Sequence, residues 1–133
     1  MKINGANYYE NKVLTMFSNI YFGKKVLVTG HTGFKGSWLT CWLLKLGAEI
    51  VGVSKDVPTK PAMFEDLQLE SMVKHHVCDI RDLDRLSNII NVERPDVIFH
   101  LAAQAIVSTS YDEPAETITT NAIGTMNIME VLR

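Results

Sequence analysis

The chain has 133 residues, of which 47% are hydrophobic and 21% charged, and its formal net charge is -2. This length suits a single domain with a buried core. The near-neutral charge, without any basic cluster, argues against a nucleic-acid-binding surface.

Strand-like and helix-like segments alternate from residue 25 onward. In chain order the predicted elements are a strand at 25–29, a helix at 37–46 ending before Gly47, a strand at 49–53, a loop at 56–61, a short helical turn near 62–67, a strand at 73–78, a helix capped by Asp82, a strand at 97–101, and a helix starting near Pro114. Apolar stripes predict the buried faces of three helices, namely Leu39, Trp42, Leu43 and Leu46; Leu83, Leu86, Ile89 and Ile90; and Ile118, Ala122, Thr125, Met129 and Leu132.

Such alternation predicts parallel strands joined by right-handed crossovers. We therefore expect an α/β fold, a Rossmann-like doubly wound parallel sheet of strand order 3-2-1-4, with a ligand at the carboxyl ends of the first and fourth strands. Residues 21–133 form this domain, and residues 1–20, which lack a clear period, form an extension. Met16 is a candidate native start, which would make residues 1–15 foreign to the domain.

The last predicted helix reaches Arg133 with no stop signal. A doubly wound nucleotide domain usually needs a second half of its sheet, so we expect a truncated, N-terminal fragment of a longer protein.

Neither a membrane span nor a secretory signal is predicted. No stretch approaches the ~20 consecutive apolar residues of a membrane span, and polar residues interrupt the N-terminus. The expected location is the cytoplasm, where Cys41 and Cys78 remain reduced and unpaired.

Three glycines follow the first strand at intervals of three residues, at Gly30, Gly33 and Gly36. A strand, a glycine turn and a helix in this order present backbone amides and a helix N-terminus to a phosphate. Gly30 permits the tight turn, Gly33 admits the pyrophosphate, and Gly36 allows close packing of helix and strand. His31 lies in this turn as a candidate phosphate contact. The alternative is an ordinary turn with incidental glycines.

Two acidic residues follow the second and third strands. Asp56 lies 20 residues after Gly36, where a carboxylate accepts hydrogen bonds from a ribose, and this favours NAD over NADP. The neighbouring Lys55 weakens that inference, and a solvated loop acid is the alternative. Asp79 can meet the adenine amino group with Ile80 on the ring, or it can cap the next turn; both interpretations stay open.

Small residues after the fourth strand, in the segment Leu101-Ala102-Ala103-Gln104, let a dinucleotide pass close to the backbone. His100 lies inside the strand pattern and is expected to be structural. His75 and His76 alternate faces of the third strand, and no histidine has a partner at zinc-ligand spacing, so no metal site is predicted.

A Tyr-x-x-x-Lys pair often serves hydride chemistry, because the lysine lowers the tyrosine pKa. Two such pairs occur, Tyr8/Lys12 and Tyr21/Lys25, but both precede the first strand, on the wrong side of the fold. We treat both as coincidence, and no catalytic residue is predicted within the chain.

Several segments resemble the CDP-glucose 4,6-dehydratases, nucleotide-sugar enzymes of the extended short-chain dehydrogenase/reductase family. The resemblance covers about residues 20–133 and rests on the segments Thr29–Leu39, Asp79–Asp82, His100–Gln104, Ser110–Pro114 and Thr120–Thr125. The Gly-x-x-Gly-x-x-Gly core marks the superfamily, and its neighbours His31, Lys35 and Trp38 are more specific for this dehydratase.

The resemblance implies an NAD-dependent lyase that converts CDP-glucose to CDP-4-keto-6-deoxyglucose, a deoxysugar precursor for surface polysaccharide. It places Phe34 and Lys35 near the pyrophosphate, Asp56 at the ribose, and Asp79 with Ile80 at the adenine. The residues it implies for cofactor binding are Gly30, His31, Thr32, Gly33, Phe34, Lys35, Gly36, Asp56, Asp79, Ile80, Leu101, Ala102, Ala103, Gln104 and Thr120. It also implies a homodimeric full-length protein whose catalytic residues lie beyond Arg133, so that the fragment alone is inactive.

The chain departs from the family pattern in two places. Ser108-Thr109 stands where an arginine usually precedes the Ser-Tyr pair, and Lys55 is unusual beside Asp56. Two alternatives remain: another nucleotide-sugar epimerase or reductase of the superfamily, or a truncated, non-catalytic chain that binds NAD weakly or does not fold.

Overall fold

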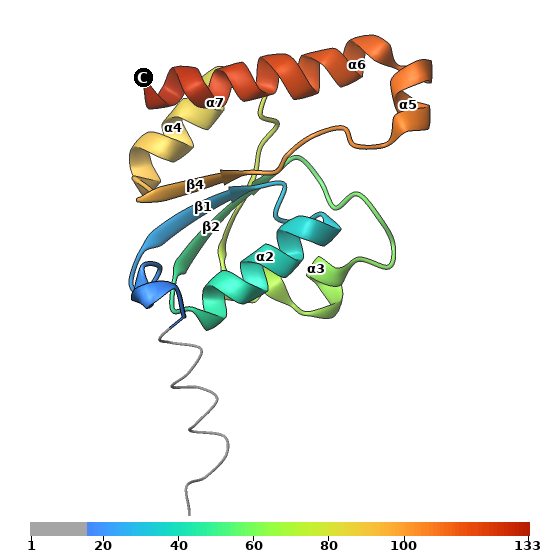
Figure 1. The fold of residues 1–133 in the computed structure, drawn as a ribbon. Coiled ribbons are helices and arrows are strands. Elements are labelled where there is room, and N and C mark those ends of the chain that lie inside the picture. Colours follow the sequence, from blue (N-terminus) through green and yellow to red (C-terminus); the bar gives the residue numbers. More distant parts are fainter. Residues whose placement is uncertain (1–15) are drawn as a thin grey trace, which may run out of the picture.

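The computed structural model describes residues 16–133, so the predictions for residues 1–15 lie outside the described residues. Its elements (Figure 1) are the 3-10 helix Met16–Asn19, β1 Lys25–Thr29, α2 Phe34–Lys45, β2 Glu49–Ser54, α3 Met63–Asp66, the 3-10 helix Leu69–Met72, β3 Lys74–Val77, α4 Leu83–Glu93, β4 Val97–His100, α5 Val107–Asp112, α6 Pro114–Ile118, the π-turn Thr119–Ile123 and α7 Gly124–Leu132.

The four strands form one parallel sheet in the order β3-β2-β1-β4, which confirms the predicted topology. Each predicted strand ends within one residue of the observed one. Figure 1 shows α2 and α3 on one side of the sheet and α4, α6 and α7 on the other. The central strand β1 contributes side chains to the core on both faces of the sheet. Val26 and Val28 pack with Leu43 of α2, whereas Leu27 packs with Leu86 of α4. Burial on both faces explains the continuous apolar run of this strand.

The helix α2 begins at Phe34, three residues before the predicted start. The predicted apolar stripe is also wrong in part, because Trp42 is 45% exposed whereas Gly36 and Thr40 are buried. Small residues face the sheet because they allow the helix to approach the backbone of the preceding turn closely. The predicted C-terminal glycine is confirmed, since Gly47 follows the helix with a φ of +80°.

The last predicted helix is interrupted by a π-turn at Thr119–Ile123, and α5 precedes it without having been predicted. The predicted stripe is wrong, since Ile118 and Met129 are each 62% exposed. A π-turn holds an extra residue, so it shifts the helical phase and turns a different face toward the core. That face carries Gly124, Asn127 and Ile128. The Nδ2 group of Asn127 donates hydrogen bonds to the carbonyls of Ile80 and Arg81, at 3.0 and 3.1 Å.

Candidate functional site

The glycine turn connects β1 to α2 and lies against the backbone that follows β4. Gly30 has a φ of +72°, a left-handed conformation that favours glycine. A Cβ atom at this position would also lie 2.8 Å from the backbone nitrogen of Ala102. Gly30 therefore satisfies both the conformation of the turn and its close approach to the β4 segment.

The other two glycines of the turn serve different purposes. A Cβ atom on Gly36 would overlap the carbonyl group of Gly30, so the fold itself requires glycine there. Gly33 has an ordinary φ of -72°, and a Cβ atom on it would meet only the Gly30 oxygen, at 3.4 Å. The missing side chain at Gly33 is therefore not required by internal packing, and it leaves open space above the turn.

The N-terminus of α2 borders that open space. Gly33 supplies no side-chain cap, so the first amides of α2 remain available to an external acceptor. Phe34 is 71% exposed and Lys35 is also exposed at this end of the helix. An open space beside uncapped amides and a lysine fits an anionic diphosphate.

Thr32 ties the turn to the loop after β2. Its side chain is buried, and its hydroxyl donates a hydrogen bond to the carbonyl oxygen of Asp56 at 2.7 Å. The Asp56 side chain is exposed. The structure therefore brings the predicted ribose-binding residue next to the predicted phosphate-binding turn.

His31 lies beneath the turn, and its side chain is fully buried. Its Nδ1 atom is 2.9 Å from the hydroxyl of Ser54, and its Nε2 atom is 2.8 Å from Nδ1 of His75. Phe64 packs edge-on against the ring. Burial, aided by the nearby His75, lowers the pKa of His31 to about 4. The imidazole is thus a neutral packing group, and no part of His31 is exposed to solvent.

Sequence reasoning missed this role of His31, although one signal was present. A Cβ atom on Gly52 would overlap the imidazole ring. Gly52 lies in the interior of β2 between two valines, and a glycine within a strand often marks a close approach by another group.

A second polar group, Thr29, joins the end of β1 to the segment after β4. Its hydroxyl oxygen accepts hydrogen bonds from the amides of Leu101 and Ala102, both at 3.1 Å. Both lone pairs are then occupied, so the hydroxyl proton is donated to Nδ1 of His100, at 2.7 Å.

This arrangement determines the tautomer of His100. Since Nδ1 accepts a hydrogen bond from Thr29, Nε2 carries the ring hydrogen and donates a hydrogen bond to the Thr125 hydroxyl at 2.9 Å. Thr125 in turn donates to the carbonyl of Asn121 at 2.7 Å. Burial lowers the pKa of His100. The residue is neutral and fully hydrogen-bonded, as expected of a structural histidine.

The segment after β4 is held by paired amide groups. The backbone amide of Gln104 donates to the Asn121 side chain at 2.8 Å, and Asn121 donates back to the Gln104 carbonyl at 3.0 Å. Beside Asn121, the hydroxyl of Thr120 is shielded from solvent and has no hydrogen-bond partner among residues 16–133. Of the small residues predicted here, Ala103 is exposed and Ala102 is partly buried.

Asp79 engages a neighbouring arginine. Its carboxylate accepts hydrogen bonds from the Arg81 backbone amide at 2.9 Å and from Nε and Nη2 of the guanidinium at 3.0 and 2.6 Å. This hydrogen bonding lowers the pKa of Asp79. The capping interpretation of Asp79 is therefore observed, and Ile80 is buried against Gly124. Their contact with an adenine stays a prediction.

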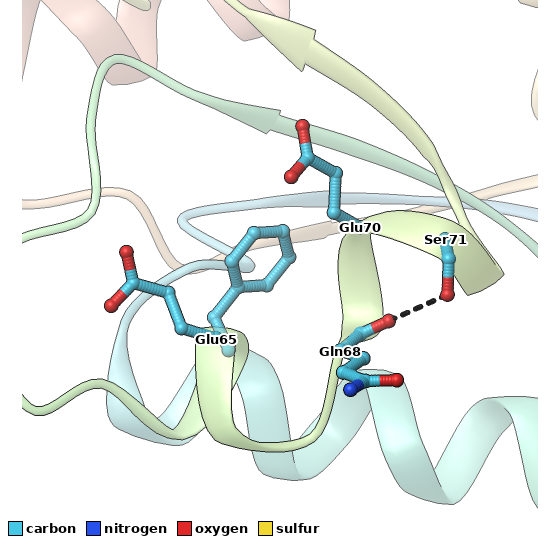
Figure 2. A pocket seen from close by; sticks show the side chains of 5 residues that line it. Glu65, Gln68, Glu70 and Ser71 are labelled. Carbon is cyan, nitrogen blue, oxygen red and sulfur yellow. Dashed lines mark hydrogen bonds between the residues drawn. The ribbon is translucent and has the colours of Figure 1, made fainter.

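Along the carboxyl edge of the sheet, two contacts join predicted residues to each other: Gly30 meets Ala102, and Thr32 meets Asp56. A third joins the predicted Gln104 to Asn121, which was not predicted. Elsewhere, a cavity of about 500 Å³ lies over α3 and the following 3-10 helix. Figure 2 shows its residues Glu65, Gln68, Glu70 and Ser71. None of the predicted site residues lines it.

The sequence also predicts no metal site and no membrane-spanning segment. Among residues 16–133, no group of three or more histidine, cysteine or acidic side chains is arranged to hold a metal ion. No helix of this region is both long and apolar enough to cross a membrane.

Of the two tyrosine–lysine pairs, Tyr21/Lys25 lies within the described residues. The Nζ atom of Lys25 is 2.8 Å from the Glu93 carbonyl, at the amino edge of the sheet, away from the glycine turn. The Tyr8/Lys12 pair lies outside the described residues.

Comparison with known proteins places this geometry in a family. The family described as GDP-mannose 4,6 dehydratase matches residues 27–133. The CDP-glucose 4,6-dehydratase of Salmonella typhimurium is 46% identical over 115 residues, covering 86% of this chain and 32% of that protein. The chain thus spans about a third of the length of this relative.

Solved structures agree with this assignment. The UDP-glucose 4-epimerase of Thermotoga maritima, solved with UDP-glucose, is 33% identical with a TM-score of 0.72, covering 80% of this chain and 33% of that one. The UDP-glucose 4-epimerase of Thermus thermophilus, solved in complex with NAD, is 30% identical with the same TM-score and the same coverage. The family model covers most of the chain, and the chain therefore belongs to the GDP-mannose 4,6-dehydratase family, within a wider group of Rossmann-type epimerases and dehydratases.

Proposed function

We propose that the chain is the NAD-binding part of a CDP-glucose 4,6-dehydratase. The observation that carries this proposal is the 46% identity to the Salmonella enzyme over 115 residues. The open space at Gly33 supports it, because the fold has no need of glycine at that position whereas a closely bound diphosphate does.

In this proposal the cofactor lies along the carboxyl edge of the sheet. The uncapped amides of α2, with Phe34 and Lys35, bind the pyrophosphate, and Asp56 binds the adenosine ribose. Asp79 and Ile80 contact the adenine. The nicotinamide half borders Leu101, Ala102, Ala103, Gln104 and Thr120. The shielded, unpaired hydroxyl of Thr120 supports this last assignment, because such a group needs a partner.

When bound, NAD would accept a hydride from C4 of the hexose and return it at C6 after water is lost across C5–C6. In this proposal the residues named above bind and orient the cofactor. His100 is unsuited to proton transfer because both of its ring nitrogens are engaged in hydrogen bonds.

The complete product of the reading frame is expected to convert CDP-glucose to a 4-keto-6-deoxy product in the presence of NAD. The keto sugar absorbs light in alkali, which gives a direct assay, and denaturing the purified protein should release NAD. No product from CDP-glucose, together with product from GDP-mannose, would assign a different substrate. Epimerisation of a UDP-sugar without loss of water would make the protein an epimerase.

We also propose a cytoplasmic homodimer that supplies a deoxysugar precursor for surface polysaccharide. The side chains of Met126, Met129 and Leu132 on α7 are each at least half exposed. Apolar side chains gathered on one helix offer a surface that a subunit contact would bury.

A further inference from the structure

The loop after β2 carries contradictory signals for cofactor choice. NAD-binding sites of this fold place an acid after the second strand to bind the ribose 2′-hydroxyl, whereas NADP-binding sites place a cationic side chain nearby to bind the 2′-phosphate. Here Lys55 and Asp56 stand side by side. Arg81, after β3, adds a second cation in this region.

Glu116 of α6 contacts both cations. One of its carboxylate oxygens, Oε1, lies 3.6 Å from Nζ of Lys55. The other, Oε2, accepts a hydrogen bond from Nη1 of Arg81. The remaining guanidinium nitrogens of Arg81 are directed to Asp79, with Nη2 at 2.6 Å from that carboxylate. Arg81 is therefore hydrogen-bonded to carboxylates on both sides, and Lys55 has Glu116 as its ion-pair partner while its side chain stays about half exposed.

The balance of charge supports this conclusion. Two cations, Lys55 and Arg81, are accompanied by three carboxylates, those of Asp56, Asp79 and Glu116. Without Glu116 the cations and the remaining carboxylates would be equal in number, and Lys55 would be left without its carboxylate partner. Glu116 is contributed by α6, more than fifty residues away in the sequence, so inspection of the β2 loop alone does not reveal its effect.

We propose that Glu116 is a specificity-determining residue that favours NAD over NADP. By holding Lys55 and Arg81, its carboxylate prevents both side chains from binding a 2′-phosphate, and it adds a negative charge that repels one. This inference rests on the proposed function, because it takes the carboxyl edge of the sheet as the dinucleotide site.

The test is the dissociation constant of each nucleotide, measured by titration of the complete reading-frame product and its E116Q variant after removal of bound cofactor. E116Q is expected to bind NADP roughly tenfold more tightly relative to NAD, the size of effect expected from one nearby charge. The matched control is E113Q, because the exposed Glu113 forms no ion pair among the described residues. The ratio of the two constants should stay unchanged in E113Q.

A double variant distinguishes two explanations for a change in E116Q: release of the Lys55 ammonium group, or a less stable packing of α6. Adding Lys55→Gln to E116Q should remove much of the gain in NADP binding, since Lys55 is the released cation. An unchanged ratio in E116Q, or a parallel loss of both affinities, would overturn the inference and leave Glu116 with a structural role. Failure of the unsubstituted protein to bind either nucleotide would instead overturn the proposed function. Glu116→Ala provides the same measurement if E116Q does not fold.

Discussion

Replacing Gly36 with alanine is expected to lower the free energy of unfolding by about 3 kcal/mol, the upper part of the range for overpacked sites. The added Cβ atom would overlap the Gly30 carbonyl, which is backbone and cannot rotate away. Either α2 must shift away from β1 or the glycine turn must change its conformation. Urea denaturation of the chain, followed by circular dichroism, would measure the loss.

Gly33→Ala is the matched control, since it adds the same methyl group three residues earlier. Its Cβ atom meets only one atom within 4 Å, at an ordinary contact distance of 3.4 Å. Stability should therefore change by less than about 0.5 kcal/mol, while the affinity for NAD falls tenfold or more. Equal losses of stability in the two variants would contradict our assignment of Gly36 to packing and Gly33 to the ligand.

Lowering the pH from 7 to 5 is expected to cost roughly 2 kcal/mol of stability through His31 alone. The pKa of this buried imidazole is lowered from 6.5 to about 4. Between these values the unfolded chain binds a proton that the folded chain does not. The contribution of His31 is thus fully present above pH 6.5 and is lost as the pH falls toward 4. Urea midpoints measured at several pH values would show the slope.

His31→Gln isolates this effect, because glutamine does not titrate. The variant should be less stable at pH 7, since it loses the packing against Phe64, but its stability should vary less between pH 7 and pH 5. His100, whose pKa is also lowered, remains in both proteins and cancels in the comparison. The carboxylates with lowered pKa values, such as Asp79, titrate below this pH window. Identical slopes for both proteins would exclude His31 as the source.

The sheet and the glycine turn could be predicted from the sequence because local signals determine them. Continuous apolar runs such as Val26–Val28 indicate strands buried on both faces, and glycine spacing indicates a turn into a helix. The order of the strands then follows from the doubly wound fold that this alternation and the glycine turn after the first strand indicate. These rules require no knowledge of which side chains meet.

The unpredicted features depend on contacts between distant residues. The shift of phase at Thr119–Ile123 arises from a π-turn, which has no simple sequence signal. His31 stands within a phosphate-binding motif, yet its ring is directed into the protein because Gly52 leaves space for it. The engagement of Lys55 by Glu116 likewise depends on where α6 packs. In each case tertiary packing, and not local pattern, decides what the residue does.

A chain of hydrogen bonds runs in one direction from the Thr29 hydroxyl through His100 and Thr125 to the carbonyl of Asn121. The direction of these hydrogen bonds restricts substitution at position 29 in a different way from the volume of the side chain. Valine has nearly the shape of threonine, but at this position it would leave the Ala102 amide and an imidazole nitrogen without a partner, whereas the Leu101 amide would keep its 3.2 Å hydrogen bond to the Thr29 carbonyl. Serine lacks a methyl group yet preserves every donor and acceptor. Removing the methyl group at position 29 should therefore be tolerated more readily than removing the hydroxyl group.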